Sequence, residues 1–338
     1  MTLKMSDIAR MANVSRSAVS LALNGKPGVS KETRKKIFKI IDKKGYKPLR
    51  KREKGGTRRV ANINLIIVVD KKGIVSRSYR SLPFFDHLVS SLAKNVNGFG
   101  GHVQIDTLRI DNLTNDLHEL LNTMTVTNAI ILGTDLSAKN AELINQQIEH
   151  VVFFDTYYDN VNADFVTMNN FQGTYAAANY IINKGYKDIG YAALDKVAPN
   201  FLARKRGFRQ ALIEHKLHVT LEHFYFIEPN QLIPTVPLDN FSTDNLPEVI
   251  FCENDYTALR LMKELINQGF KIPDDIAIMG FDDIYEGILV TPELTTVHVS
   301  IEQIVNQAIM QLQEQVSTSN WEPQKCLIST RIVKRESL

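Results

Sequence analysis

From residue 62 onward, short apolar runs alternate with stretches in which apolar residues recur every three or four positions. The short runs predict strands, and the longer stretches predict amphipathic helices. In the first part of this region we expect strands over 62–70, 102–108, 128–133, 150–155 and 164–168. Helices are predicted between them over 83–98, 115–124 and 137–149. This alternation is typical of a parallel sheet covered by helices on both faces.

The same alternation repeats in the second part of the region. Strands are predicted over 187–194, 222–227, 247–252 and 275–283, with helices over 173–183, 201–215 and 256–268. A last stretch, with strand-like runs at 294–299 and 326–337 and a helix at 301–315, would return between the two units. We therefore predict a two-lobed α/β domain over 62–338, with a first lobe of about 62–168 and 299–328 and a second of about 169–298 and 329–338.

The first 47 residues show only the helical period. Ser6 is a natural N-cap for one helix, whose apolar side we assign to Ile8, Ala9 and Met11. Asn13 stands at the following turn, where a residue that tolerates the left-handed conformation brings a second helix back at a steep angle. The pattern predicts a helix-turn-helix.

The second helix of this pair has one apolar stripe and one polar face. With Ser15 as its cap, the spacing buries Ala18, Val19 and Ala22 or Leu23. The side chains predicted to face outward are Arg16, Ser17, Ser20 and Leu21.

These outward side chains have the chemistry of DNA readout. Arg16 suits guanine edges, Ser17 and Ser20 suit bases or phosphate, and Leu21 suits a thymine methyl group. A helical hairpin of an enzyme or of a bundle would show a similar pattern.

A third helix favours the DNA-binding interpretation, because it completes a compact headpiece over 1–47. Ser30 would cap it, and Thr33, Ile37, Ile40 and Ile41 would form its inner side.

Charge is distributed unevenly along the chain. Residues 1–59 contain 18 Lys and Arg against 4 Asp and Glu, a net charge of +14, whereas the rest contains 22 against 33, a net charge of −11. Clustered cations neutralise phosphates and release counterions, so the basic end is expected to bind DNA. Residues 48–61 are the most basic part and read as a hinge or linker. A solvated charged face is the alternative interpretation.

The cysteine content and the apolar runs indicate the cellular compartment in which the protein is expected. Only Cys252 and Cys326 are present, and neither belongs to a CxxC pair, so no disulfide framework or metal site is indicated. The N-terminus has no apolar core of the signal-peptide type, and the longest apolar run, within 63–69, is the length of a strand. We expect a cytoplasmic, nucleoid-associated protein without a membrane partner, a cofactor or a metal.

Polar residues that directly follow apolar runs are the candidates for a ligand site, because ligands bind at the carboxyl ends of parallel strands. Asp155, Asn254 and Asp282 stand in such positions, and Arg204 lies near the start of a predicted helix. Together they would offer carboxylates, an amide and a guanidinium to a small polar ligand. Each also has a structural interpretation, as a helix cap or as a member of a surface ion pair.

Several motifs, in the right order, resemble the LacI/GalR family of bacterial transcription regulators over nearly the whole chain. They include the headpiece SDIARMANVSRSAVSLALNGKPGVSKETRKKI with the GYKP that follows, RKRGFRQAL at 204–212, FCENDYTALRLMKELINQGFKIPDDIAIMGFDDI at 251–284, and TPELTTV at 291–297. The resemblance implies a homodimeric repressor that binds double-stranded operator DNA. It also implies a helix-turn-helix headpiece joined to an α/β two-lobed periplasmic-binding-protein-like (type I) effector domain.

The resemblance further implies which residues meet each partner. DNA contacts are expected at Ser6, Ser15, Arg16, Ser17, Ala18, Ser20, Leu21, Asn24, Ser30, Thr33, Tyr46, Arg50, Lys51 and Arg52. Effector contacts are expected at Phe84, Phe85, Asp155, Arg204, Asn254 and Asp282. Family effectors include sugars, sugar phosphates, nucleosides and purines, and the carboxylates and amide here favour a carbohydrate.

Two other functions remain open from the sequence. An enzyme with a fused headpiece would need a nucleophile and base pair or a phosphate-binding loop, and neither pattern is present. An architectural DNA-binding protein would use the basic end without any effector. A ligand-induced change in DNA affinity would distinguish the regulator from both.

The hinge departs from the family pattern. Members usually carry an Ala and a Leu one turn apart in a helix that wedges into the minor groove, whereas here Arg52 takes the Ala place and Gly55 the Leu place. We therefore expect residues 50 to 59 to follow the phosphate backbone without intercalating.

This interpretation of the hinge predicts a change in salt dependence. Replacing Lys51, Arg52 and Lys54 with Gln should flatten the plot of log affinity against log salt concentration, by about one unit of slope for each phosphate that is no longer neutralised. Titrations of operator binding across a salt series measure the slope. An unchanged slope would refute the role of these residues.

Overall fold

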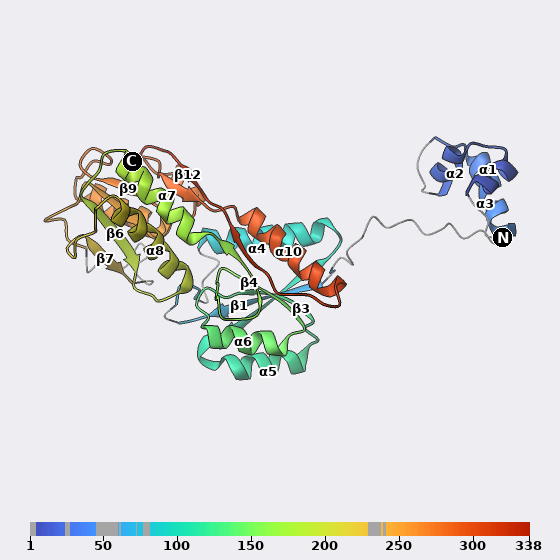
Figure 1. Cartoon of the computed structure of the whole chain (residues 1–338), viewed down its shortest axis with the longest axis horizontal. Helices are drawn as coiled ribbons and strands as arrows, with labels where there is room; N and C mark the ends of the chain where they lie inside the picture. The colour runs from blue at the N-terminus through green and yellow to red at the C-terminus, as the bar shows by residue number, and fades with distance from the viewer. Residues whose placement is uncertain are drawn as a thin grey trace. The chain divides into compact units, whose positions relative to one another are not determined.

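The computed structural model describes residues 5–23, 28–44, 60, 62–71, 73–76, 82–228, 238 and 241–338. The chain divides into two compact units, Met1–Thr57 and Arg58–Leu338. Figure 1 shows the elements of both units in chain order.

The first unit contains three helices, α1 (Met5–Ala12), α2 (Arg16–Leu23) and α3 (Lys31–Lys44). Their shared core includes Ile8, Val19 and Ile37, all 0% exposed. Asn13 has a φ of 54° at the turn between α1 and α2, the left-handed conformation expected there. The helix-turn-helix predicted from the sequence is thus present.

Two details of α1 differ from the prediction. The buried residue after Ala9 is Ala12, 1% exposed, whereas Met11 is 42% exposed. Ala12 lies four positions after Ile8 and so shares its face, while Met11 is rotated away from it. Ser6 is not the N-cap, because α1 already begins at Met5, and Ser6 is exposed in its first turn.

The first lobe of the larger unit is built on a parallel six-stranded sheet. Its strand order is β11-β5-β4-β3-β1-β2, and every neighbouring pair is parallel. The strands are β1 (Asn62–Val69), β2 (His102–Arg109), β3 (Asn128–Leu132), β4 (His150–Phe154), β5 (Asp164–Met168) and β11 (Lys325–Ile328).

Helices cover both faces of this sheet. Helices α4 (Pro83–Gly98) and α10 (Ile301–Ser317) pack on one face, and α5 (Leu113–Thr123) and α6 (Ala138–Gln147) on the other, as Figure 1 shows. A short 3-10 helix, η2 (Ile110–Asn112), precedes α5. Alternate residues of β1 face the two layers: Leu65 and Ile67 belong to one core cluster, and Ile66 and Val68 to the other. Burial on both faces explains why this strand is an unbroken apolar run.

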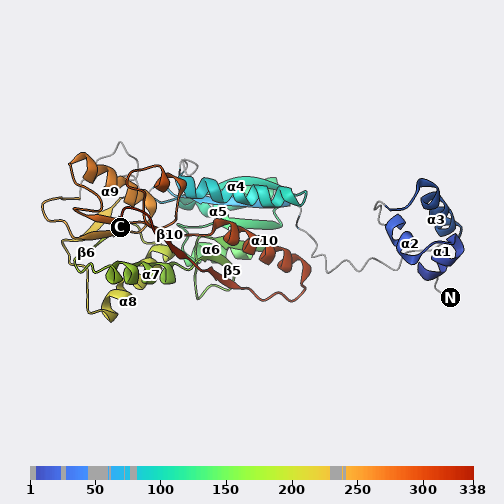
Figure 2. The same ribbon diagram turned by 90° about the horizontal axis from the view of Figure 1, so that it is seen from above.

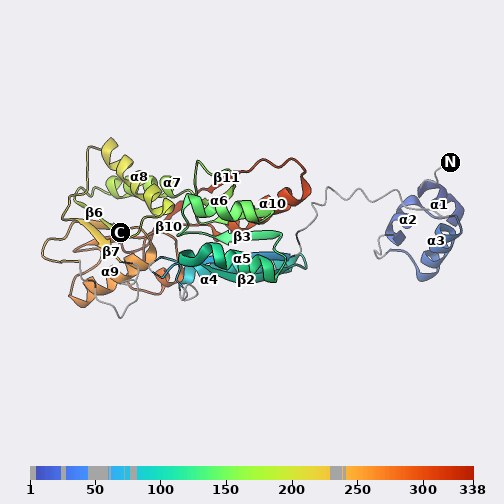
Figure 3. The ribbon, with the colours of Figure 1, turned by 90° about the horizontal axis from the view of Figure 1, so that it is seen from below.

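The second lobe repeats the plan with a parallel four-stranded sheet of order β7-β6-β8-β9. Helices α7 and α8 lie on one side of this sheet and α9 on the other, as the opposite views in Figures 2 and 3 show. The elements are α7 (Asn170–Asn183), β6 (Ile189–Leu194), α8 (Pro199–Glu214), β7 (Phe224–Ile227), β8 (Val249–Cys252), α9 (Asp255–Asn267) and β9 (Ala277–Met279).

The chain passes between the lobes three times, after β5, after β10 (Thr296–His298) and between β11 and β12 (Arg331–Val333). Strands β10 and β12 pair antiparallel, and the 3-10 helix η4 (Tyr285–Ile288) follows β9. The strand-like run predicted at 326–337 is therefore two strands, one in the first-lobe sheet and one in this pair. Among the described residues, no helix is long and apolar enough to cross a membrane.

The packing of α7 against α8 depends on the absence of a side chain at Gly207. A Cβ there would overlap the carbonyl oxygen of Phe171 and crowd the Thr174 hydroxyl. We predict that Gly207→Ala lowers the free energy of unfolding of the larger unit by about 1–3 kcal/mol. Gly98→Ala is the matched control, because nothing lies within 4 Å of a Cβ there. It should raise stability by up to about 1 kcal/mol through helix propensity. Urea unfolding of both variants measures the difference, and equal effects would contradict the packing argument.

Candidate functional site

In the first unit, the second helix presents the predicted DNA-contacting face. Arg16 and Ser17 are exposed, whereas Ala18, Ser20 and Leu21 are half-buried. Ser20 and Leu21, which the sequence predicts to face outward, are therefore only partly accessible. Arg16 and Ser17 are therefore the exposed members of the base contacts predicted on this helix.

Two serines organise the ends of the helices. Ser15 Oγ accepts from the amide of Ala18 at 3.1 Å and lies 2.8 Å from Ser17 Oγ. Ser30 Oγ accepts from the amide of Thr33 at 3.1 Å and donates to its hydroxyl at 2.8 Å. Both serines act as N-caps, as predicted, and both remain exposed.

Five further predicted DNA contacts lie outside the described residues: Asn24, Tyr46, Arg50, Lys51 and Arg52. Among the α3 cations whose exposure the structure describes, Lys31, Lys35, Lys36 and Lys39 are exposed and give this helix a positive surface.

In the larger unit, all six residues predicted to contact an effector line one small cavity between the lobes. Phe84 and Phe85 come from α4 of the first lobe, and Asp155 follows β4. From the second lobe, Arg204 lies on α8, Asn254 caps α9, and Asp282 follows β9. Their side chains are buried, with exposed fractions between 3% and 7%.

Arg204 is the centre of this cluster. Its Nε donates to Asn170 Oδ1 at 2.8 Å, one terminal nitrogen donates to the Glu253 carbonyl oxygen, and the other donates to Asp282 Oδ1 at 3.2 Å. The Phe281 ring lies 3.8 Å from the guanidinium carbon. The surface ion pair that the sequence left open is thus excluded, because the guanidinium is buried.

A chain of hydrogen bonds continues from Arg204 into the first lobe. Asn170 Nδ2 donates to Asn200 Oδ1 at 3.0 Å, and Asn200 Nδ2 donates to Asp155 Oδ1 at 2.6 Å. Asp155 also accepts from Thr134 Oγ1 at 2.6 Å. The network joins both lobes through side chains that the sequence analysis did not single out.

Asn254 both lines the cavity and caps helix α9. Its Oδ1 accepts from the amide of Thr257 at 2.8 Å, so the helix-cap interpretation is correct for that atom. Asp255, beside it in the sequence, faces away from the cavity and accepts from Thr296 Oγ1 at 2.6 Å. Asp283 pairs with His298 and Arg335. Asn254 and Asp282 therefore line the cavity, whereas the residues that follow them, Asp255 and Asp283, do not.

Two further contacts hold the lobes together. The amide of Phe84 donates to Tyr256 Oη at 2.8 Å, and Lys196 Nζ lies 2.7 Å from Asp70 Oδ2 and 3.8 Å from Asp135 Oδ1. With the side chains so placed, the cavity has a free volume of about 30 Å³. That is room for about one water molecule.

Burial dominates the titration of the cavity carboxylates. It raises the pKa of Asp282 to about 8, although the positive charge of Arg204 acts in the opposite direction. Burial likewise raises the pKa of Asp155 to about 6, against its hydrogen bond from Thr134 and the charge of Arg204. Both groups therefore hold their protons more tightly than an exposed carboxyl does. Among the described residues, no three His, Cys, Asp or Glu side chains come together as a metal site requires.

A helix-turn-helix unit joined to a two-lobed α/β domain with a polar cavity defines a class of DNA-binding transcriptional regulators. Residues 4–48 match the model of bacterial regulatory proteins of the lacI family, and residues 178–338 match a periplasmic binding protein-like domain. The chain thus carries a headpiece of the lacI family joined to a periplasmic binding protein-like domain, the domain composition of a DNA-binding transcriptional regulator.

Similar proteins span nearly the whole chain. It is 26% identical to the probable HTH-type transcriptional repressor ExuR of Bacillus subtilis, over 98% of this chain and 97% of that protein. It is also 26% identical to the HTH-type transcriptional repressor PurR of Pasteurella multocida, with the same coverage.

Solved structures show the same fold. The transcriptional regulator CelR in complex with cellobiose has a TM-score of 0.68 and 20% identity, over 99% of both chains. The lac repressor dimer bound to operator and the anti-inducer ONPF has a TM-score of 0.66 and 17% identity, over 100% of this chain and 99% of that one. The predicted fold class, a helix-turn-helix headpiece with a periplasmic-binding-protein-like two-lobed domain, is confirmed.

The raised pKa of Asp282 predicts a pH-dependent stability. An aspartate has a pKa of about 4 in the unfolded chain. The folded protein binds the extra proton between that pH and about 8, so stability from this group falls as pH rises through this window. Asp282→Asn should remove this fall. The slope of stability against pH should therefore differ from that of the wild type between pH 6 and 8, above the range where Asp155 titrates, and the accumulated difference in stability should be largest above pH 8. Urea unfolding at a series of pH values measures it, with the exposed Asp274→Asn as control. Parallel curves for wild type and Asp282→Asn would contradict the assignment.

Proposed function

We propose that this repressor binds a small neutral carbohydrate between its lobes and that the bound carbohydrate changes its operator affinity. The observation that carries the proposal is the convergence of Asp155, Asn254, Asp282 and Arg204 on one buried cavity. Carboxylates accept hydrogen bonds from hydroxyl groups, and an amide or guanidinium donates to them, so this set matches a polyol. Phe84 and Phe201 add aromatic surface for the apolar face of a sugar ring.

The charge of the cavity argues against an anionic effector. Arg204 is the one cation among the described residues that line it, and Asp282 already pairs with this guanidinium. Two carboxyl groups, on Asp155 and Asp282, face the same space. A phosphate placed there would find no unpaired cation, and its negative charge would be buried without a partner, so sugar phosphates fit less well than neutral sugars.

The size of the cavity implies that the lobes separate when the ligand enters. About 30 Å³ of free space is far smaller than a sugar ring. The contacts of Phe84 with Tyr256 and of Lys196 with Asp70 cross the cleft and would open first. The ligand would then favour whichever degree of closure it fits, and this population shift would change the fit of the headpieces to the operator.

The similar proteins support two further parts of the proposal. One structural relative was solved as a complex with cellobiose, and another as a dimer on its operator. We infer that this chain also acts as a homodimer on a two-fold related operator and that it works in the cytoplasm, where that DNA lies. Sedimentation equilibrium of the purified chain tests the dimer, and a monomer at operator-binding concentrations would refute it.

The effector is tested by a thermal-shift screen with neutral sugars, sugar phosphates and purines. A ligand at 100 times its dissociation constant stabilises the folded state by about 2.7 kcal/mol. We expect neutral sugars to give the shift in the wild type, and Arg204→Ala to abolish it. Arg206→Ala, an exposed arginine on the same helix, should respond as the wild type does. Operator affinity is then measured with and without the sugar that binds.

Three results would overturn the proposal. A shift with purines or sugar phosphates alone would exclude the neutral carbohydrate. A shift that persists in Arg204→Ala would place the ligand elsewhere. Operator affinity unchanged by a sugar that binds the cleft would exclude the regulatory role.

A further inference from the structure

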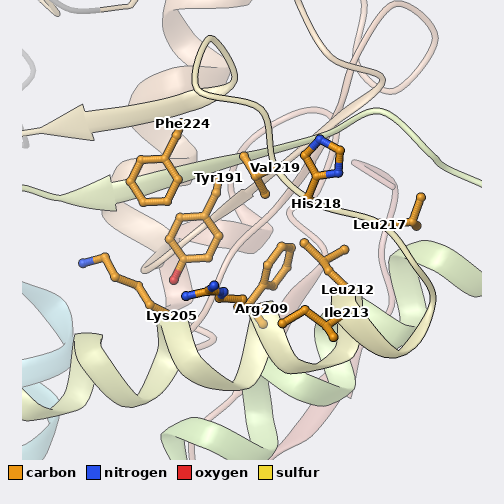
Figure 4. A pocket seen from close by; sticks show the side chains of 10 residues that line it. Tyr191, Lys205, Arg209, Leu212, Ile213, Leu217, His218, Val219 and Phe224 are labelled. Carbon is orange, nitrogen blue, oxygen red and sulfur yellow. The ribbon is translucent and has the colours of Figure 1, made fainter.

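A second and larger cavity lies within the second lobe, away from the cleft. It has a volume of about 510 Å³, within the range of small-molecule sites. Figure 4 shows it between helix α8 and the strands β6 and β7, with the segment 217–219 along its edge. It shares no lining residue with the cleft cavity.

Aromatic rings form the inner wall of this cavity. Tyr191 stacks on Phe224 with ring centroids 5.3 Å apart, and it meets Phe208 edge to face at 5.0 Å. Val219 points toward the rings from the connecting segment, and Leu217 lines the cavity farther from them. A planar ring placed here would find both stacking and edge-to-face partners.

Cations stand at one end of the cavity. Lys205 and Arg209 are one helical turn apart on α8, so both side chains reach the same end. Arg209 is exposed, and within the described part of the chain no group accepts a hydrogen bond or ion pair from its guanidinium. None of the described residues that line the cavity is Asp or Glu. The open end therefore favours a negative charge.

We propose that this cavity is a second ligand site and that it binds an aromatic monocarboxylate. The aromatic ring of the ligand lies against Tyr191, Phe208 and Phe224. Its carboxylate pairs with Arg209, whose planar guanidinium can bind it through two hydrogen bonds, and with Lys205. The site is separate from the carbohydrate cleft and supplies the regulator with a second signal.

The two sites share a structural connection. Lys205 follows Arg204 in the sequence, and Glu253 precedes Asn254. The buried carboxylate of Glu253 lies 3.2 Å from Lys205 Nζ and accepts from Tyr191 Oη at 2.9 Å, while its backbone carbonyl accepts from Arg204. A ligand that draws Lys205 away from Glu253 acts on the residues that position both Arg204 and Asn254. Binding at one site therefore changes affinity at the other, and the effect is reciprocal.

The site is tested by calorimetric titration of the full-length chain with 3-phenylpropionate and, separately, with its neutral amide. We expect one molecule of the acid to bind per chain and the amide to bind at least about tenfold more weakly, because it lacks the charge. Arg209→Gln should weaken the acid by about tenfold and leave the amide nearly unchanged. Arg206→Gln, also exposed on α8 but outside the cavity, should bind the acid as the wild type does.

A second variant tests the apolar part of the site. Val219→Trp fills the cavity and should abolish binding of both compounds, with its melting temperature showing that the chain still folds. The proposal is overturned if the acid gives no binding in the millimolar range, if acid and amide bind equally, or if Arg209→Gln binds the acid as the wild type does. Because Arg209 is exposed, that last comparison decides the question even where Val219→Trp fails to fold.

Discussion

The arrangement of the cleft depends on the burial of one positive charge. The Arg204 guanidinium is 3% exposed, and a buried cation is tolerated only where acceptors and counter-charge surround it. Three separate segments supply them: Asn170 from α7, the Glu253 carbonyl from the end of β8, and Asp282 from the end of β9. The loop after β9 is held in an unusual conformation, with Asp282 at a φ of 122°. The requirement to satisfy Arg204 thus fixes where several elements of the second lobe meet.

The same requirement reaches the first lobe through amide side chains. Asn170 accepts from Arg204 and donates to Asn200, which in turn donates to Asp155. Each side-chain amide has an NH₂ group that donates and an oxygen that accepts. Because Arg204 can only donate, every hydrogen bond in the series runs from donor to acceptor in the direction away from Arg204. A ligand that inserts its hydroxyl groups would exchange partners within this series instead of creating new buried charges. This explains how a cleft can be closed with little free space and still accept a polar ligand.

The lobes and the ends of their strands could be predicted from periodicity, because a residue that follows a buried strand lies at the ligand-facing edge by geometry alone. That argument located Asp155, Asn254 and Asp282. It missed Asn170, Asn200 and Tyr256, which lie on helices and reach the cleft only through tertiary packing. Local pattern also could not separate Met11 from Ala12, since the two are neighbours on a short helix. Contacts across the lobes have no sequence signature, so they require the three-dimensional arrangement.

The division of charge limits how an effector can act on DNA binding. The first 59 residues carry a net +14 and the remainder a net −11, so phosphates attract the one part and repel the other. The larger unit therefore adds little direct affinity for DNA. A ligand that neutralises charge within a buried cavity hardly changes the electrostatic attraction between the protein and DNA. Screening confines such fields to about 8–10 Å at physiological salt. If the cleft binds an effector as proposed, its signal is transmitted as geometry, through the closure of the lobes, and not as a change in electrostatic attraction.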